Sequence, residues 1–155
     1  LKKKYWFNIK ERPEIVILEG WCVGAKAQSN KQLIKAVNSE EKAKDHKMIW
    51  RKYVNNQLKN KYKKLFNQLN CLIYLKVKNF SLLQNWRLMQ EKKLWLSSKK
   101  KKNLKIMSKG DVINFMQTYQ RITQNMFKET PKYASIILKL TSNHQIKSMI
   151  YKKNY

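Results

Sequence analysis

Acidic residues, glycines, prolines and cysteines are all scarce in this sequence, and their scarcity excludes several classes of protein. Three glycines and two prolines among 155 residues leave no room for a collagen repeat or a Gly-rich linker. The two cysteines, Cys22 and Cys71, lie far apart without a CxxC pair, which excludes a disulfide scaffold and a thiolate zinc site. Since His46 and His144 are the only histidines, a His/Cys zinc cluster is not expected either.

Long hydrophobic runs are also missing. None approaches the roughly 18 residues that a membrane-spanning helix requires, so an integral membrane protein is not expected. The first residue, Leu1, is followed by three lysines and not by the apolar core of a signal peptide. Because nothing in the sequence requires oxidation, we expect a protein of the reducing cytoplasm.

The charge is strongly one-sided, with 35 Lys+Arg against 9 Asp+Glu and a formal net charge of +26. Most of the basic residues are lysines, whereas arginine, the usual clamp for phosphates and bases, occurs at only four positions. Lys, Asn and Ile have AT-rich codons, so we interpret much of the charge as solvated surface encoded by an AT-rich genome. A basic module that binds RNA or a ribosome-like assembly is the alternative hypothesis.

Apolar runs and helical periodicity predict an α/β protein that forms one domain over residues 1–155. The predicted strands, each of a buried type, cover 15–18, 71–75 and 136–140. The predicted helices cover about 50–69, 81–96 and 108–130, the last beginning at Ser108 with Asp111 three residues later and stopping before Pro131. This alternation indicates a mostly parallel sheet flanked by helices, with a long loop at 24–47 that leaves room for a short helix and an open, Lys-rich loop at 97–107.

Two features of this pattern could carry chemistry. Glu19 follows strand 15–18, at the edge of a parallel sheet where ligands bind and where an acid can hold Mg²⁺. Arg87 and Glu91 lie four residues apart on one helix face. Spacing alone favours an exposed ion pair over an arginine aimed at a phosphate and held by the glutamate. Cys22, with no histidine placed to activate it, is interpreted as a small buried residue.

The segment Ile17–Ala25 closely resembles the LEGWCVGA segment of bacterial D-glycerate 3-kinases. These enzymes are P-loop kinases related to uridine kinase, pantothenate kinase and phosphoribulokinase. The resemblance continues in the same order over about residues 14–146. It includes Val37, Asn38, Glu41, Asp45, the segment 50–55, a WR-x-x-QE match at 86–91, Met107, Ser108, Val112, Phe115, Tyr119, Leu140, His144 and Ile146.

This resemblance implies ATP- and Mg²⁺-dependent phosphorylation of D-glycerate to 3-phosphoglycerate, with pantothenate or a nucleoside as alternative acceptors. Glu19 would be the Walker-B-type acid near Mg²⁺, and Arg87 would be the lid arginine that neutralises the transferred phosphoryl group. The lid would span about 81–108. The residues implied on the substrate side, or in orienting Arg87, are Trp21, Cys22, Asn38, Gln90 and Glu91.

One departure from the family is large, since no GxxxxGK[ST] phosphate loop occurs among Gly20, Gly24 and Gly110. The acid that accepts the substrate proton precedes the EGW segment in the family and is also absent here. Smaller departures at Ala36 and Glu40 leave the detail of that loop open. We therefore expect the C-terminal part of an incomplete P-loop kinase fold, inactive by itself, in which a strand is missing between 15–18 and 71–75.

Overall fold

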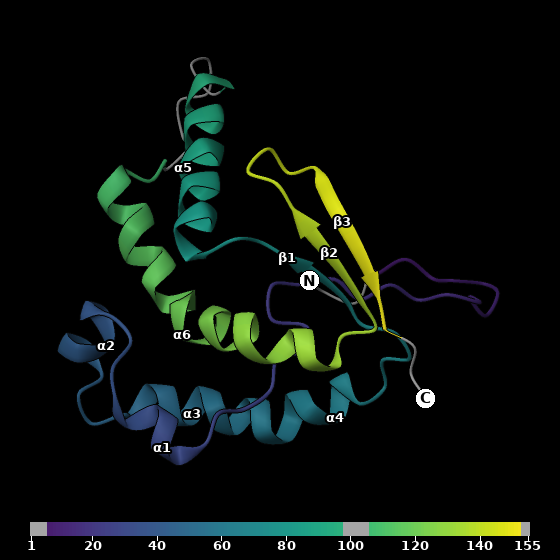
Figure 1. Ribbon diagram of the computed structural model, residues 1–155, viewed down its shortest axis with the longest axis horizontal. Helices are drawn as coiled ribbons and strands as arrows, with labels where there is room; N and C mark the ends of the chain where they lie inside the picture. Colours follow the sequence, from purple (N-terminus) through teal and green to yellow (C-terminus); the bar gives the residue numbers. More distant parts are fainter. Residues whose placement is uncertain (1–5, 98–105, 153–155) are drawn as a thin grey trace.

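The computed structural model describes residues 6–97 and 106–152, so most of the predicted loop 97–107 lies outside the described residues. These residues form helices and a small sheet (Figure 1). No helix among them is long and apolar enough to cross a lipid bilayer. In chain order the elements are α1 Asn30–Ile34, α2 Ser39–Lys44, α3 Ile49–Gln57, the π-helix η2 Leu58–Tyr62, α4 Lys63–Phe66, β1 Ile73–Lys76, α5 Phe80–Ser97, α6 Lys109–Tyr133, β2 Ile136–Leu140 and β3 Ile146–Tyr151.

The sheet has the order β1-β2-β3 and is only partly parallel. Strands β1 and β2 pair in parallel, as predicted, with Ile73 opposite Ile136. Strand β3 pairs with β2 in the antiparallel sense, which the sequence did not predict. The sequence of β3, IKSMIY, lacks the clean alternation of apolar and polar residues from which a half-buried strand is recognised, and every residue of the strand is exposed.

The prediction of a buried strand at 15–18 is wrong for this structure. The segment has no strand pairing, and Ile15, Val16 and Ile17 are 79%, 79% and 86% exposed. The aliphatic run signals a need for burial, but a strand also needs a hydrogen-bonded neighbour, and none lies beside this segment among the described residues.

Strand β1 is covered on one face only, so the prediction of a fully buried strand there is also wrong. Tyr74 is buried, whereas Ile73 and Leu75 are 54% and 56% exposed. Residues paired across the sheet share a face, and on this face Met149 and Tyr151 of β3 are exposed as well. The uncovered face of the sheet is therefore apolar, and β1 has no strand paired at its other edge among the described residues.

The main helices agree with the predictions, apart from details at their ends. The predicted helix at 50–69 is the continuous run α3–η2–α4, and that at 81–96 is α5. Ser108 and Asp111 form a reciprocal capping box at the start of α6, as predicted. Helix α6 continues through Pro131 to Tyr133, contrary to prediction, because the proline removes only one N–H close to the helix end and the N–H of Ala134 still bonds to Thr130.

The core lies where α6 packs between the sheet and the run α3–η2–α4 (Figure 1). Met126 of α6 belongs to the same buried cluster as Tyr74, Ile137 and Leu58. One long helix thus contributes to the packing of both layers.

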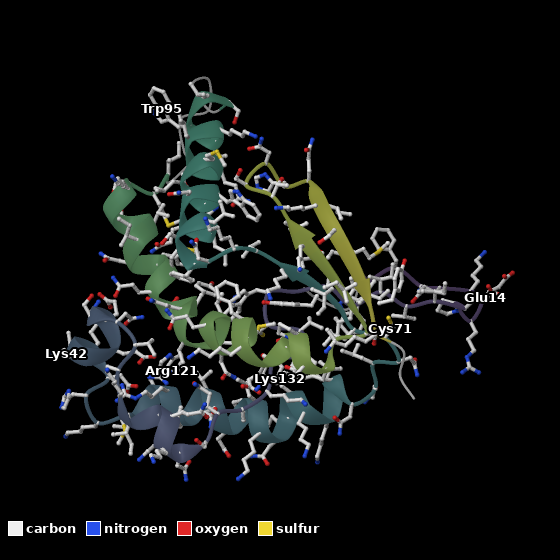
Figure 2. The ribbon with its side chains drawn as sticks, in the orientation of Figure 1. Glu14, Lys42, Cys71, Trp95, Arg121 and Lys132 are labelled. Atoms are coloured by element: carbon white, nitrogen blue, oxygen red, sulfur yellow. The ribbon has the colours of Figure 1, made fainter. Side chains whose placement is uncertain are left out.

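The predicted loop at 24–47 contains two short helices and is attached to α6 by a buried arginine. Helices α1 and α2 begin at the side-chain caps Ser29 and Asn38. Arg121 extends from α6 toward these helices (Figure 2) and forms a two-pronged pair with Glu41, with both N–O distances 2.7 Å. It also donates to the carbonyl oxygens of Gln32 and Lys35, at 3.0 Å and 2.7 Å.

A second buried arginine continues this network. Arg51 of α3 donates to the carbonyl oxygens of Leu33 and Asp45, at 2.8 Å and 3.0 Å. The carboxylate of Asp45 accepts the N–H groups of Trp50 and Arg51 at the start of α3. Two arginines and two acids therefore hold α1, α2, α3 and α6 together, and their buried charges are paired as burial requires.

We expect acid to weaken the fold through Glu41 and Asp45. Burial alone would raise the pKa of Glu41, but hydrogen bonds from Arg121 and Val37 and the charges of both arginines outweigh burial and lower it. Burial likewise opposes ionisation of Asp45, yet the N–H groups of Arg51 and Trp50 lower its pKa. A carboxyl whose folded pKa is lowered stabilises the fold above its unfolded pKa, and this stability is lost as the pH falls through the folded value.

The free energy of unfolding should therefore fall as the pH is lowered below about 4.5, near the unfolded pKa of a carboxyl group. Urea unfolding of the polypeptide expressed from the whole reading frame, between pH 3 and 7, measures this dependence. The variants Glu41→Gln and Asp45→Asn should each show a shallower dependence than the wild type, with Glu129→Gln as a control outside the network. Slopes equal to that of the wild type in both variants would contradict the expectation.

Candidate active site

Arg87, the predicted lid arginine, is held on α5 by two neighbours one helical turn away. Its guanidinium forms an ion pair with Glu91 and donates a hydrogen bond of 3.1 Å to Gln90 Oε1. The guanidinium carbon also lies 5.9 Å from the ring centre of Phe115 on α6. These contacts orient the Arg87 side chain, and because it is 31% exposed it is still accessible to a ligand.

Glu91 is buried, which corrects the spacing-based interpretation of an exposed ion pair. It is 6% exposed, and its second carboxylate oxygen accepts the N–H of Met107 at 3.0 Å. Met107 directly precedes the cap of α6, so the carboxylate connects α5, the arginine and the start of α6. This geometry is suited to orienting Arg87 and leaves Glu91 little surface for substrate.

Trp21 lies against α6, where Phe115, Tyr119 and Thr123 follow one another at intervals of four residues. Its indole N–H donates to Thr123 Oγ1 at 2.9 Å, and its ring meets Tyr119 edge-on with centroids 4.6 Å apart. Tyr119 in turn contacts Phe115, with ring centres 4.9 Å apart. The structure therefore brings Trp21 and Arg87 to one row of α6 through side chains to which the sequence analysis assigned no role.

Cys22 and Trp21 line a cleft of about 550 Å³ together with Tyr53, Tyr62 and Lys61. Cys22 is half-buried, and burial raises the pKa of its thiol. The thiol form is therefore favoured, which agrees with the interpretation of Cys22 as a packing residue and not a nucleophile.

Asn38 has its polar atoms engaged within the protein. The side-chain oxygen accepts the N–H of Glu41 at the start of α2. The amide nitrogen donates to Gln117 O and Gln120 Oε1, at 2.9 Å and 3.2 Å. Asn38 therefore caps α2 and connects it to α6. Its predicted contact with substrate stays a prediction.

Glu19 is exposed and makes no hydrogen bond or ion pair with any residue of the described ranges. Its predicted convergence with Arg87 stays a prediction. Within residues 6–97 and 106–152 there is no group of three His, Cys, Asp or Glu side chains that could hold a metal. In kinases Mg²⁺ is held by one or two carboxylates together with the phosphates of the nucleotide, so Glu19 alone would supply one ligand and would need the nucleotide for the others.

Gly24, in the segment that resembles the kinases, has a structural role. Its φ of +79° is in the left-handed region, and a Cβ there would lie 2.8 Å from a methyl carbon of Leu72. Its carbonyl accepts the hydroxyl of Tyr133 at 2.8 Å. Glycine at this position is explained by backbone geometry and close packing.

The sequence analysis also missed a contact in the N-terminal half of α5. The indole N–H of Trp86 donates to Ser142 O at 2.8 Å, and its ring stacks on His144 at 3.9 Å between centres. Trp86 thereby attaches the helix that carries Arg87 to the turn between β2 and β3. Its position beside Arg87 in the WR-x-x-QE match was the available signal.

A second, larger cavity of about 830 Å³ lies near the N-terminal ends of β1 and β2. It is lined by the segment Gly24–Asn30, by residues of α3, η2 and α4, and by Tyr133. None of the residues predicted for the active site lines it. Its size alone therefore does not make it the site of the predicted chemistry.

Comparison with known proteins identifies the fold. No family model matches the chain, and no curated protein matches its sequence. Among solved structures it is similar to D-glycerate 3-kinase from Cryptococcus neoformans var. grubii serotype A, with a TM-score of 0.66 and 20% identity. The match covers 93% of this chain and 52% of that protein, so the chain spans about half the length of the structure it matches.

Removing the Glu91 carboxylate should destabilise the junction of α5 and α6. The variant Glu91→Ala leaves the Arg87 guanidinium and the Met107 N–H without their acceptor, and we expect a loss of about 2 kcal/mol in the free energy of unfolding. The variant Glu129→Ala, which breaks the more exposed pair with Lys132, should cost less than about 1 kcal/mol. Both variants are measured by urea unfolding of the polypeptide expressed from the whole reading frame, and equal losses in the two would contradict a buried, shared role for Glu91.

At the level of the fold, the comparison confirms the resemblance to D-glycerate 3-kinase that the sequence analysis identified.

Proposed function

We propose that this chain provides the substrate side and the lid arginine of an ATP-dependent small-molecule kinase, and that its acceptor is the 3-hydroxyl of D-glycerate. The observation that carries the proposal is the placement of Arg87, which is accessible and held by Glu91 and Gln90 in a fold similar to D-glycerate 3-kinase over 93% of the chain. The EGWCVGA segment supports glycerate over pantothenate or a nucleoside.

In this proposal Arg87 neutralises the charge that develops on the transferred phosphoryl group, and Glu91 keeps its guanidinium oriented. Trp21 and Cys22 line the acceptor side, with Gln90 beside the arginine. ATP and Mg²⁺ would supply the phosphoryl group and the neutralising metal charge. Glu19 would act on the Mg²⁺ indirectly, together with ligands beyond the described residues.

We further propose that a strand from outside these 155 residues lies between segment 15–18 and the edge of β1, and that it leads into the phosphate loop. Three observations support this strand. Ile15, Val16 and Ile17 are exposed. One edge of β1 is unpaired among residues 6–97 and 106–152, and the chain spans about half of the structure it matches. An inserted strand would pair with the open edge of β1 on one side and with segment 15–18 on the other.

The kinase proposal is tested on the polypeptide expressed from the whole reading frame. It should phosphorylate D-glycerate with ATP and prefer it to pantothenate and uridine. The variant Arg87→Ala should lower kcat by roughly 10² to 10³ with a much smaller change in KM, since the arginine acts on charge that develops in the transition state.

The matched control for this test is Arg12→Ala, which removes an exposed arginine from the N-terminal segment. It should keep wild-type kinetics. Absence of turnover with every acceptor would refute the kinase proposal, and preference for pantothenate or uridine would refute the assignment of glycerate.

The isolated 155-residue chain should neither transfer phosphate from ATP nor melt cooperatively, because it lacks a phosphate loop and exposes strand edges and apolar faces. Circular dichroism melting and an ATP–glycerate assay of this segment test the expectation. A cooperative melt accompanied by turnover would contradict the proposed missing strand.

A further inference from the structure

One face of α6 carries a row of contacts between the two halves of the proposed active site. Phe115, Tyr119 and Thr123 follow each other at intervals of four residues and therefore lie along one side of the helix. Trp21 contacts Tyr119 and Thr123, and Arg87 lies over Phe115.

The end of the row near Trp21 is fixed by a hydrogen bond as well as by ring contact. The indole donates to Thr123 Oγ1, and that hydroxyl donates to the carbonyl of Tyr119 at 2.9 Å. Trp21 follows Glu19 and Gly20 in the chain, and Val23 N–H bonds back to Gly20 O at 3.4 Å. The position of the indole on α6 therefore restricts where the short turn after Glu19 can lie.

At the other end of the row, Arg87 is contacted from two helices, by polar residues of its own helix α5 and by Phe115 of α6. Glu91 and Gln90 hold the guanidinium from α5, one turn along its own helix. Phe115 holds it from α6. Contacts from two elements define the guanidinium position better than a pair within one helix, and its other N–H groups bond to no residue in the described ranges.

We propose that Phe115 and Tyr119 are positioning residues that set the separation between the Glu19–Trp21 turn and the guanidinium of Arg87. The aromatic rings are stiff spacers, and their edge-on and tilted contacts have preferred geometries. Displacement of either ring would move the arginine relative to the acceptor side, and phosphoryl transfer depends steeply on such placement. The inference rests on the proposed kinase function.

The test compares two Phe→Leu changes in the polypeptide of the whole reading frame. The variant Phe115→Leu keeps an apolar side chain on α6 but removes the π face under Arg87. The matched control Phe66→Leu removes a ring on α4 that contacts Tyr62, at 5.6 Å between ring centres. We expect Phe115→Leu to lower kcat for glycerate phosphorylation about tenfold, with KM for ATP and the unfolding midpoint in urea close to those of Phe66→Leu. The variant Tyr119→Leu should also lower kcat.

A spectroscopic readout separates positioning from general packing. In the polypeptide of the whole reading frame, the side-chain Nε–Hε signal of Arg87 can be assigned by its absence in Arg87→Lys. The ring of Phe115 should shift this signal, and Phe115→Leu should remove the shift while Phe66→Leu preserves it.

The possible outcomes are distinct. A lowered kcat together with a moved Arg87 signal, both specific to the α6 variants, supports the inference. Wild-type kcat in Phe115→Leu, or a loss of activity explained entirely by lower stability, overturns it and leaves the kinase proposal intact. Failure of the wild-type protein to phosphorylate any acceptor overturns both the kinase proposal and the positioning inference. This outcome is distinct from the others because it is seen in the wild type, without any variant.

Discussion

The buried pair between Arg121 and Glu41 determines how the rest of this structure is arranged. The segment before α3 has only short helices, which do not persist alone in water. Arg121 joins that segment to α6 through a two-pronged pair and through carbonyl oxygens. Arg51 and Asp45 extend the same network to α3. Charged groups placed here are costly unless all are paired, so the network restricts the helices to one mutual arrangement.

Once α6 is fixed in this way, it supports the residues of the proposed site. Residues matched in the resemblance therefore divide into two physical roles. Glu41 and Asp45 belong to the buried network, and Asn38 caps α2 against α6. Trp21 and Arg87 contact Tyr119 and Phe115, which lie in the same helix. Positions that a sequence comparison treats alike thus include some that hold the scaffold and some that are available for chemistry.

The sheet shows the opposite situation, apolar groups without a covering partner. Ile15, Val16 and Ile17 are exposed, and one face of β1 is exposed with them. Such surfaces are aggregation-prone in a monomer and are normally paired or covered. They coincide with a match to only about half of a kinase structure. The proposed strand would pair with the open edge of β1 and with segment 15–18, and it would lead into the phosphate loop that this sequence lacks.

Local sequence determined the elements that depend on neighbours a few residues away. The Ser108–Asp111 cap, the helices α5 and α6 and the strand β2 were predicted because capping and periodicity are short-range properties. The Arg87–Glu91 pair was visible from its spacing, but only the tertiary structure decided that Glu91 is buried. The same holds for the contact of Trp21 with Thr123, 102 residues apart, and for the unpaired state of segment 15–18. A periodic pattern specifies which side of an element is apolar, whereas the element that covers that side is decided by distant parts of the chain.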